Sequence, residues 1–149
     1  MSLGMPGDDE EVQSVTDRPY WEENRGTKET VGLADEMLEL VKSFAPELEL
    51  KYNKFYIGLA KDGQPNNFVI FYAKKNSFRA EIRLASSPDI DQQLETAGIE
   101  VMDYTKFGRY RLRLTKNDIK KHSDLLLKLL KTSYGLDVDA VGSAMKAKA

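Results

Sequence analysis

The chain has 149 residues, 41% of them hydrophobic, which suits a single domain with a buried core. It contains no cysteine, so disulfide bonds and cysteine chemistry are excluded. No apolar run approaches the roughly 18–20 residues of a transmembrane helix, and the N-terminus has no apolar signal region. We therefore expect a soluble cytoplasmic protein without a membrane partner.

The formal net charge of −2 is divided unevenly along the chain. Residues 1–50 carry 13 Asp/Glu against 4 Lys/Arg, or −9, whereas residues 51–149 carry 11 against 18, or +7. Two interpretations stay open. Either the basic part binds anions, or the acidic part is only a solvated tail.

Residues 1–18 have no periodic apolar pattern, so we expect a disordered leader there. Residues 138–149, rich in small side chains, are expected to be a flexible tail. Residues 19–137 then form a single domain. Tyr20 and Trp21 are the first large aromatic residues, and we expect them to pack onto that domain.

The first helix is predicted over residues 28–44. Thr27 is a suitable N-cap, and Pro46 follows as a terminator. Apolar residues recur at helical spacing within this range: Val31, Ala34, Leu38 and Val41.

Three runs rich in aromatic and β-branched residues follow, at residues 55–60, 67–73 and 78–84. Turn-forming residues separate them, which is typical of antiparallel strands joined by short loops. The first loop has five residues and the second is a two-residue turn at Asn76-Ser77.

These loop lengths predict a register in which Phe71 pairs with Ile57 on one side and with Ile82 on the other. Phe71 is then a core residue of a central strand. One face of this sheet is entirely apolar: Phe55, Ile57, Leu59, Val69, Phe71, Ala73, Ala80, Ile82 and Leu84.

The remaining elements complete an α+β fold. Residues 48–52 and 109–114 alternate as strands, and residues 88–97 form a short helix. A long helix is predicted from Thr115 to Gly135. We therefore predict an antiparallel sheet of four to five strands, with two main helices and one short helix.

The second face of the sheet carries basic and aromatic side chains. In the predicted register Lys74 lies opposite Arg79, a like-charge pair that is unfavourable unless an anion lies between them. The arginines of residues 109–113 join this face if the last strand pairs alongside. The candidate nucleic-acid-binding residues are Tyr56, Tyr72, Lys74, Arg79, Arg83, Arg109, Arg111 and Arg113.

Guanidinium groups fork onto phosphates and aromatic rings stack on bases, so this face suits nucleic acid. Arg111 should lie near its centre, because Arg109 and Arg113 flank it. The alternative is that the arginines pair with Glu81 and with helix carboxylates, and that a helix covers the apolar half of the face.

The sequence offers no catalytic, metal or cofactor motif. His122 is the only histidine and is expected to be a surface or packing residue. The acids within residues 89–95 begin a short helix, where they favour the helix dipole. Asp62 with Glu81 and Arg83 loosely follows the acid and acid-x-Lys pattern of metal-dependent nucleases, but Arg replaces the lysine that assists water activation. A nuclease remnant therefore ranks last.

Short motifs carry a resemblance to a family of uncharacterised bacterial domains labelled predicted transport proteins. They are Lys54-Phe55-Tyr56-Ile57, Asn67-Phe68-Val69, Lys74-Lys75 and Leu129-Leu130-Lys131-Thr132-Ser133-Tyr134. Through the order of its elements the chain is more remotely similar to the YjbR/MmcQ family, although Tyr110 stands near the place of a tryptophan usual there. The resemblance spans about residues 54–134, implies an α+β fold and a DNA-binding role, and supplies no catalytic residues.

We therefore expect a non-enzymatic accessory domain, without a cofactor or metal, that binds nucleic acid through an Arg/aromatic sheet face. The alternative is a protein–protein interaction module of a larger system, in which the same face meets the acidic residues of a partner.

Overall fold

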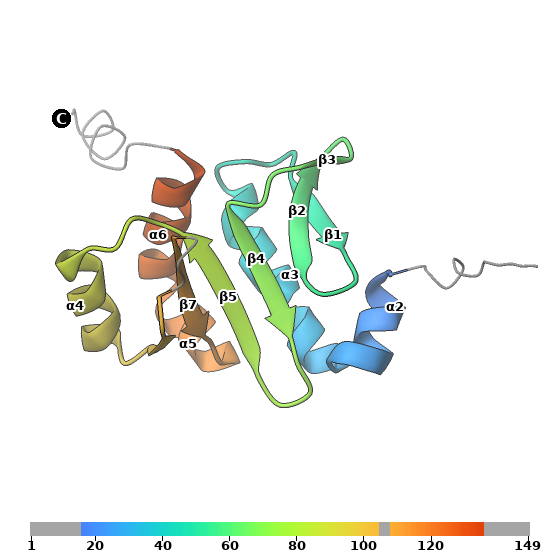
Figure 1. The fold of residues 1–149 in the computed structure, drawn as a ribbon, viewed down its shortest axis with the longest axis horizontal. Coiled ribbons are helices and arrows are strands. Elements are labelled where there is room, and N and C mark those ends of the chain that lie inside the picture. The colour runs from blue at the N-terminus through green and yellow to red at the C-terminus, as the bar shows by residue number, and fades with distance from the viewer. Residues whose placement is uncertain (1–15, 105–107, 136–149) are drawn as a thin grey trace, which may run out of the picture.

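The computed structural model describes residues 16–104 and 108–135 (Figure 1). Every strand pair is antiparallel, and the sheet order is β1-β2-β4-β5-β7-β6, with β3 paired to β2. The strands are β1 (Glu49–Tyr52), β2 (Ile57–Lys61), β3 (Gln64–Pro65), β4 (Val69–Ala73), β5 (Phe78–Arg83), β6 (Glu100–Met102) and β7 (Arg109–Arg113). This confirms the α+β class. The described sheet has seven strands rather than four or five, because β3 and β6 are too short to leave a readable alternation.

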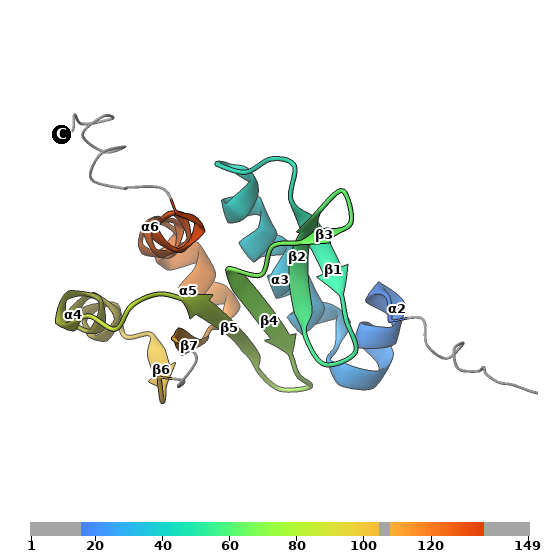
Figure 2. The ribbon, with the colours of Figure 1, turned by 45° about the horizontal axis from the view of Figure 1, so that its top comes forward.

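The helices gather mainly on one side of this sheet. They are α2 (Arg18–Tyr20), the π-helical turn η1 (Trp21–Arg25), α3 (Lys28–Lys42), α4 (Pro88–Ala97), α5 (Lys116–Lys121) and α6 (Ser123–Tyr134). In Figure 1 the viewer faces the sheet and α3, α5 and α6 lie behind it; Figure 2 shows the same layers after a turn of 45°. None of the described helices has both the length and the apolarity to cross a membrane.

The core lies between the sheet and this helix layer. Apart from Phe55, all members of the predicted apolar face are buried in it, with Ile57 and Phe71 fully inaccessible. Phe55 is instead 62% exposed. Its placement on that face was wrong because the chain still turns there: the backbone N–H of Asn53 donates to the Tyr56 carbonyl over 3.0 Å, and β2 begins only at Ile57.

The register is confirmed on one side of β4 and corrected on the other. Ile57 pairs with Phe71 as predicted, but Phe71 pairs with Ala80 rather than Ile82. The connection has four residues, Lys74 to Ser77, closed by a 2.8 Å bond from the Lys74 N–H to the Ser77 carbonyl. Because side chains alternate with a period of two, this two-residue shift leaves every side chain on its predicted face.

The predicted long final helix is two helices separated at His122, whose backbone leaves helical geometry at φ −114° and ψ 31°. The residues around the break are polar, so no buried side chain holds the two halves in line. The break lets α5 pack against α3 while α6 contacts both α3 and β5.

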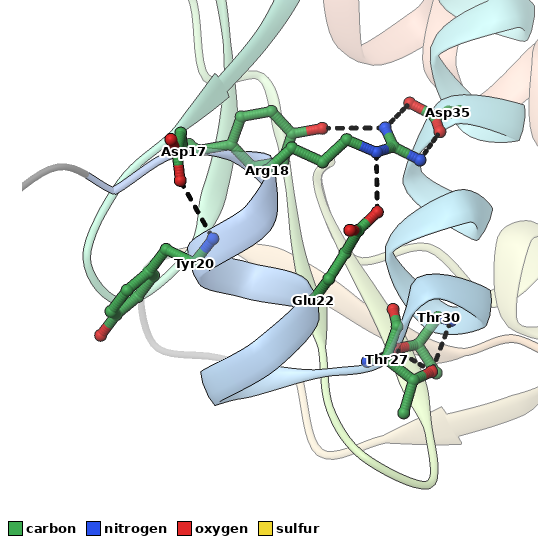
Figure 3. Close-up of polar contacts among 8 residues, drawn as sticks. Asp17, Arg18, Tyr20, Glu22, Thr27, Thr30 and Asp35 are labelled. Atoms are coloured by element: carbon green, nitrogen blue, oxygen red, sulfur yellow. Dashed lines mark hydrogen bonds and ion pairs between the residues drawn. The ribbon is translucent and has the colours of Figure 1, made fainter.

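The first helix is confirmed, since α3 begins at Lys28 and ends at Lys42. Thr27 caps it: its hydroxyl accepts from the Thr30 N–H over 3.0 Å, and the Thr30 hydroxyl accepts from the Thr27 N–H over 2.9 Å (Figure 3). These bonds satisfy donors that a helix N-terminus otherwise leaves unpaired.

The segment before α3 is tied to the domain by Trp21 and Arg18. Trp21 is 2% exposed and its Nε1 donates to the Asn53 carbonyl over 2.8 Å, which confirms the expected packing. Arg18 lies between Glu22 and Asp35 (Figure 3), with nitrogen–oxygen distances of 2.9 and 2.6 Å.

The expected leader includes residues 16–18, which the structure describes in contact with the rest of the domain. The Thr16 hydroxyl also donates to the Tyr52 carbonyl over 3.1 Å, so the ordered contacts begin before Pro19. Residues 1–15 of the expected leader, and the expected tail at residues 138–149, lie outside the described part of the chain.

Candidate nucleic-acid interface

The arginines of β5 and β7 lie on the sheet face opposite the main helices. Ala80, Ile82, Tyr110 and Leu112 are buried in the core, and residues alternating with them point to the other side. No described helix passes in front of β4 and β5 in Figure 1. We call the following set the arginine face: Tyr72, Arg79, Glu81, Arg83, Arg109, Arg111 and Arg113.

Cross-strand pairing arranges this face in three rungs. β5 and β7 pair with each other, which meets the condition under which the arginines of β7 join this face. The pairing places Arg79 opposite Arg113 and Arg83 opposite Arg109. Glu81 forms the middle rung with Arg111. Directly opposed like charges destabilise a sheet, so the two outer rungs need a compensating anion or hydrogen-bond acceptor.

Glu81 supplies compensation at the centre. It is 7% exposed, and its Oε2 accepts from Arg79 Nε over 3.0 Å. Arg111 Nε lies 3.4 Å from the same oxygen, an ion pair without hydrogen-bond geometry, and this buried Nε has no hydrogen-bond partner among the described residues. One carboxylate thus serves two guanidinium groups.

Arg109 is held by backbone carbonyls. Its Nη1 donates to the Glu81 carbonyl over 3.2 Å and its Nη2 to the Asn67 carbonyl over 3.0 Å. Burial, and secondarily the nearby charge of Arg83, lowers the pKa of Arg109 below its ordinary value. Arginine remains protonated at neutral pH despite such a shift, so Arg109 keeps its charge.

Tyr72 lies on β4, opposite Arg79. The Arg79 guanidinium carbon stands 4.2 Å from the centre of the Tyr72 ring, within cation–π distance. Burial raises the pKa of Tyr72, and the charge of Glu81 adds to this effect. The phenol is therefore neutral at physiological pH, and the face of its ring packs against the Arg79 guanidinium group.

The remaining two arginines are more accessible. Arg113 Nη1 lies 3.1 Å from Glu100 Oε2, with 45% and 59% of the two side chains exposed. Arg83 is exposed and has no carboxylate within ion-pair distance in the part of the chain that the structure describes. Among the described residues, Glu81 and Glu100 are the carboxylates within ion-pair distance of Arg79, Arg111 and Arg113. The five arginines and these two carboxylates together carry a formal charge of +3.

Two predicted site residues lie at the margin of the face. Lys74 is not opposite Arg79, because the register shift gives that place to Tyr72 and leaves Lys74 in the β4–β5 loop. Tyr56 precedes β2, half-buried, close enough to affect the electrostatics of Arg109. The other six predicted residues come together on the face.

A pocket that the sequence did not indicate adjoins the face. We call it the hairpin pocket; it has a volume of about 500 Å³ and lies between η1 and the β4–β5 hairpin. Its lining includes Asn24, Arg25, Phe55 and Lys75, none of which was predicted as a site residue. Phe55 lies in an apolar run, so the sequence indicated a core residue rather than an exposed one. Arg25 follows two glutamates closely in sequence, so it did not stand out as part of a basic cluster.

The residues considered for metal chemistry are not brought together. Asp62 lies in the turn before β3, whereas Glu81 is buried among arginines in β5. Asp91 accepts a 2.8 Å bond from the Tyr110 hydroxyl. Within residues 16–104 and 108–135, no group of three or more His, Cys, Asp or Glu is placed to hold a metal ion.

Comparison of the chain with protein-family models, with curated proteins and with solved structures found no match. The resemblance drawn from the short sequence motifs therefore stays a prediction, and the functional argument depends on the geometry of the site.

Proposed function

We propose that this protein is a non-enzymatic accessory domain that binds single-stranded nucleic acid across the arginine face. The observation that carries the proposal is the arrangement of the outer rungs, where Arg83 opposes Arg109 and Arg79 opposes Arg113. At the Arg79–Arg113 rung, Glu81 and Glu100 already lie beside the guanidinium groups. A phosphate would therefore relieve the repulsion chiefly at the Arg83–Arg109 rung, where Arg83 has no ion pair to any described residue.

The positions of the guanidinium groups support a site that is already formed before binding. Arg79 is held by Glu81 and Tyr72, and Arg109 by two carbonyls. Side chains that are ordered in the free protein lose less conformational entropy on binding. Their planes also offer stacking surfaces for unpaired bases, which favours single strands over a duplex.

Arg83 provides the sharpest test, because it is exposed and carries no ion pair among the described residues. Arg83→Ala should weaken the binding of a fluorescent thymidine oligonucleotide, measured by anisotropy at low salt. Lys120→Ala is the matched control: it removes one exposed positive charge from α5, on the helix side of the sheet. We expect Lys120→Ala to bind as the wild type does.

Equal losses for the two variants would show only a general charge effect and would contradict the proposal. Displacement of the oligonucleotide by polyglutamate at equal charge concentration would instead favour the alternative, a module for an acidic protein partner. Nucleic acid binding that polyglutamate cannot displace supports the proposal, because an unstructured polyanion lacks bases to stack.

A further inference from the structure

The hairpin pocket is lined by four basic side chains from two parts of the chain. Arg25 comes from η1, Lys74 and Lys75 from the β4–β5 loop, and Arg79 from β5. No acidic residue is among those that line it in the described chain. Glu81 holds Arg79 from the sheet side, and Glu23 contributes only its carbonyl, which accepts from Lys75 Nζ over 3.1 Å. The pocket therefore concentrates positive charge with little local neutralisation.

Arg25 shows a specific need for an acceptor. Its Nε is buried and makes no hydrogen bond to any residue that the structure describes. Buried donors are nearly always paired, since an unpaired one loses its hydration without compensation. Because this Nε is itself inaccessible, an anion in the pocket would reach it only after a shift of the Arg25 side chain, which lines the pocket. An anionic ligand would supply the acceptor that this guanidinium lacks.

Phe55 gives the pocket an aromatic wall. It is 62% exposed, unusual for a phenylalanine, and it carries cations close to its ring: Arg25 at 5.2 Å and Lys54 at 5.5 Å from the centroid. A nucleobase placed against this ring would replace water on an apolar surface. A nucleotide carries both groups that the pocket suits, a base for the Phe55 ring and a phosphate for the basic side chains.

The pocket is built on rigid elements rather than on loops alone. A Cβ added at Gly26, which ends η1, would lie 2.8 Å from the Ala73 carbonyl oxygen, so the turn and β4 are in close backbone contact. Trp21 fixes the other end of η1 through its bond to the Asn53 carbonyl. The same turn therefore positions Arg25 beside the segment that carries Phe55.

We propose that the hairpin pocket binds the terminal phosphate of a nucleic-acid strand, with the adjoining base against Phe55. This inference rests on the proposed function, because Arg79 and Tyr72 belong to both the pocket and the arginine face. A terminal phosphomonoester carries a charge near −2 at neutral pH, against −1 for an internal phosphodiester, and so suits a pocket lined by four cationic side chains better. The volume of about 500 Å³ is that of a small-ligand site.

The test compares thymidine dodecamers with a 5′-phosphate, with a 3′-phosphate, and with hydroxyl groups at both ends. We expect one phosphorylated strand to bind at least about tenfold tighter than the unphosphorylated strand, as added charge-assisted hydrogen bonds imply. Arg25→Gln should remove this advantage, and Phe55→Ala should reduce it. Arg83→Ala should weaken all three strands while keeping their ratio. Circular dichroism would verify that each variant is folded, and Lys74→Gln is a second pocket variant in an exposed loop.

Equal affinity for the three strands would overturn the inference and leave the proposed function standing, because the face would still bind the unphosphorylated strand. A phosphate advantage that survives in both Arg25→Gln and Lys74→Gln would also overturn it. If no strand binds, the proposed function fails. In that case thymidine 5′-monophosphate decides the pocket: shifts of the Phe55 ring signals in NMR spectra, absent with thymidine, would support a phosphate site, and unchanged spectra would overturn it.

Discussion

At the scale of single residues, Glu81 stabilises the fold but should reduce the affinity of the arginine face for nucleic acid. It is buried and its Oε2 contacts Arg79 and Arg111, so it allows two guanidinium groups to lie close together. The same carboxylate also reduces the positive charge of the arginine face, and so weakens the attraction of that face for a polyanion. Stability and nucleic-acid affinity should therefore change in opposite directions when this charge is removed.

Glu81→Gln should lower the free energy of unfolding by roughly 1–3 kcal/mol, because two arginines lose their charged acceptor. Gln keeps a side-chain oxygen that can still accept from Arg79, while the face gains one positive charge. Oligonucleotide affinity should therefore rise several-fold, measured by anisotropy on protein shown to be folded. Glu100→Gln is the control: Glu100 is 59% exposed, and among the described residues it forms an ion pair only with Arg113, so its loss should cost less than about 1 kcal/mol. A folded Glu81→Gln variant with weaker binding would contradict the role of this face.

Phe71 and Phe55 test the predicted core by contrast. Phe71 is fully buried, and its ring stacks on that of Phe78 with centroids 5.7 Å apart. Phe71→Ala should cost roughly 3–5 kcal/mol in urea unfolding. Phe55→Ala, at a 62% exposed site, should cost less than about 1 kcal/mol. Similar losses at the two positions would show that the core boundary lies elsewhere.

At the scale of elements, the contact between η1 and β4 depends on the absence of a side chain. A Cβ at Gly26 would meet the Ala73 carbonyl oxygen at 2.8 Å and the Thr30 hydroxyl at 2.6 Å. The backbone atom cannot move aside without disturbing the sheet. The position is thus restricted by space, and its φ of −124° is open to any residue.

Gly26→Ala should therefore destabilise the protein, whereas Gly32→Ala should stabilise it by roughly 0.4–1 kcal/mol. Gly32 lies inside α3, and a Cβ there would meet no atom within 4 Å. Thermal unfolding of the two variants, read against the wild type, gives the two signs. A stabilising Gly26→Ala substitution would mean that η1 does not approach β4 as closely as described.

Tyr110 joins α4 to the sheet. Its hydroxyl donates to Asp91 Oδ1 over 2.8 Å and accepts from the Ser87 N–H over 2.9 Å, although the side chain itself is 2% exposed. Tyr110→Phe keeps the packing and removes these bonds, so we expect a loss of about 1–2 kcal/mol in the free energy of unfolding. In the Tyr110→Phe variant, amide hydrogen exchange should be accelerated relative to the wild type more within α4 than within α3. Unchanged protection of α4 would argue against this anchoring role.

The elements could be predicted where local patterns decide them. Short sequence patterns are enough to predict the cap at Thr27, the helix Pro88–Ala97, and the sheet face on which each residue of β2, β4 and β5 lies. The predicted β4–β5 register was wrong by two residues. A two-residue turn and a four-residue turn put the same side chains on each face, so the apolar pattern could not distinguish them. The break at His122 depends on tertiary packing, which no local pattern records.

At the scale of the whole molecule, the sequence predicted the arginine face but not the hairpin pocket. The face can be predicted because every second residue of a strand lies on the same side of the sheet, and the arginines of β5 and β7 occupy such alternate positions. The pocket requires Arg25, Phe55 and Lys75 to meet, from segments that no short-range rule brings together. The excess of basic residues after residue 50 is reflected in the described structure: the five arginines of the arginine face and the two carboxylates paired with them, Glu81 and Glu100, carry a formal charge of +3, on the side of the sheet away from helices α3, α5 and α6.

The most direct test of this account is the salt dependence of wild-type binding to a single-stranded oligonucleotide. Each phosphate contact releases counterions, so the slope of log affinity against log salt should be about −0.7 per contact. Three to five contacts by the arginine face predict a slope of roughly −2 to −3.5, and Arg83→Ala should reduce its magnitude by about 0.7. Absence of binding at low salt to single-stranded DNA and RNA, or a slope that Arg83→Ala leaves unchanged, would contradict the account.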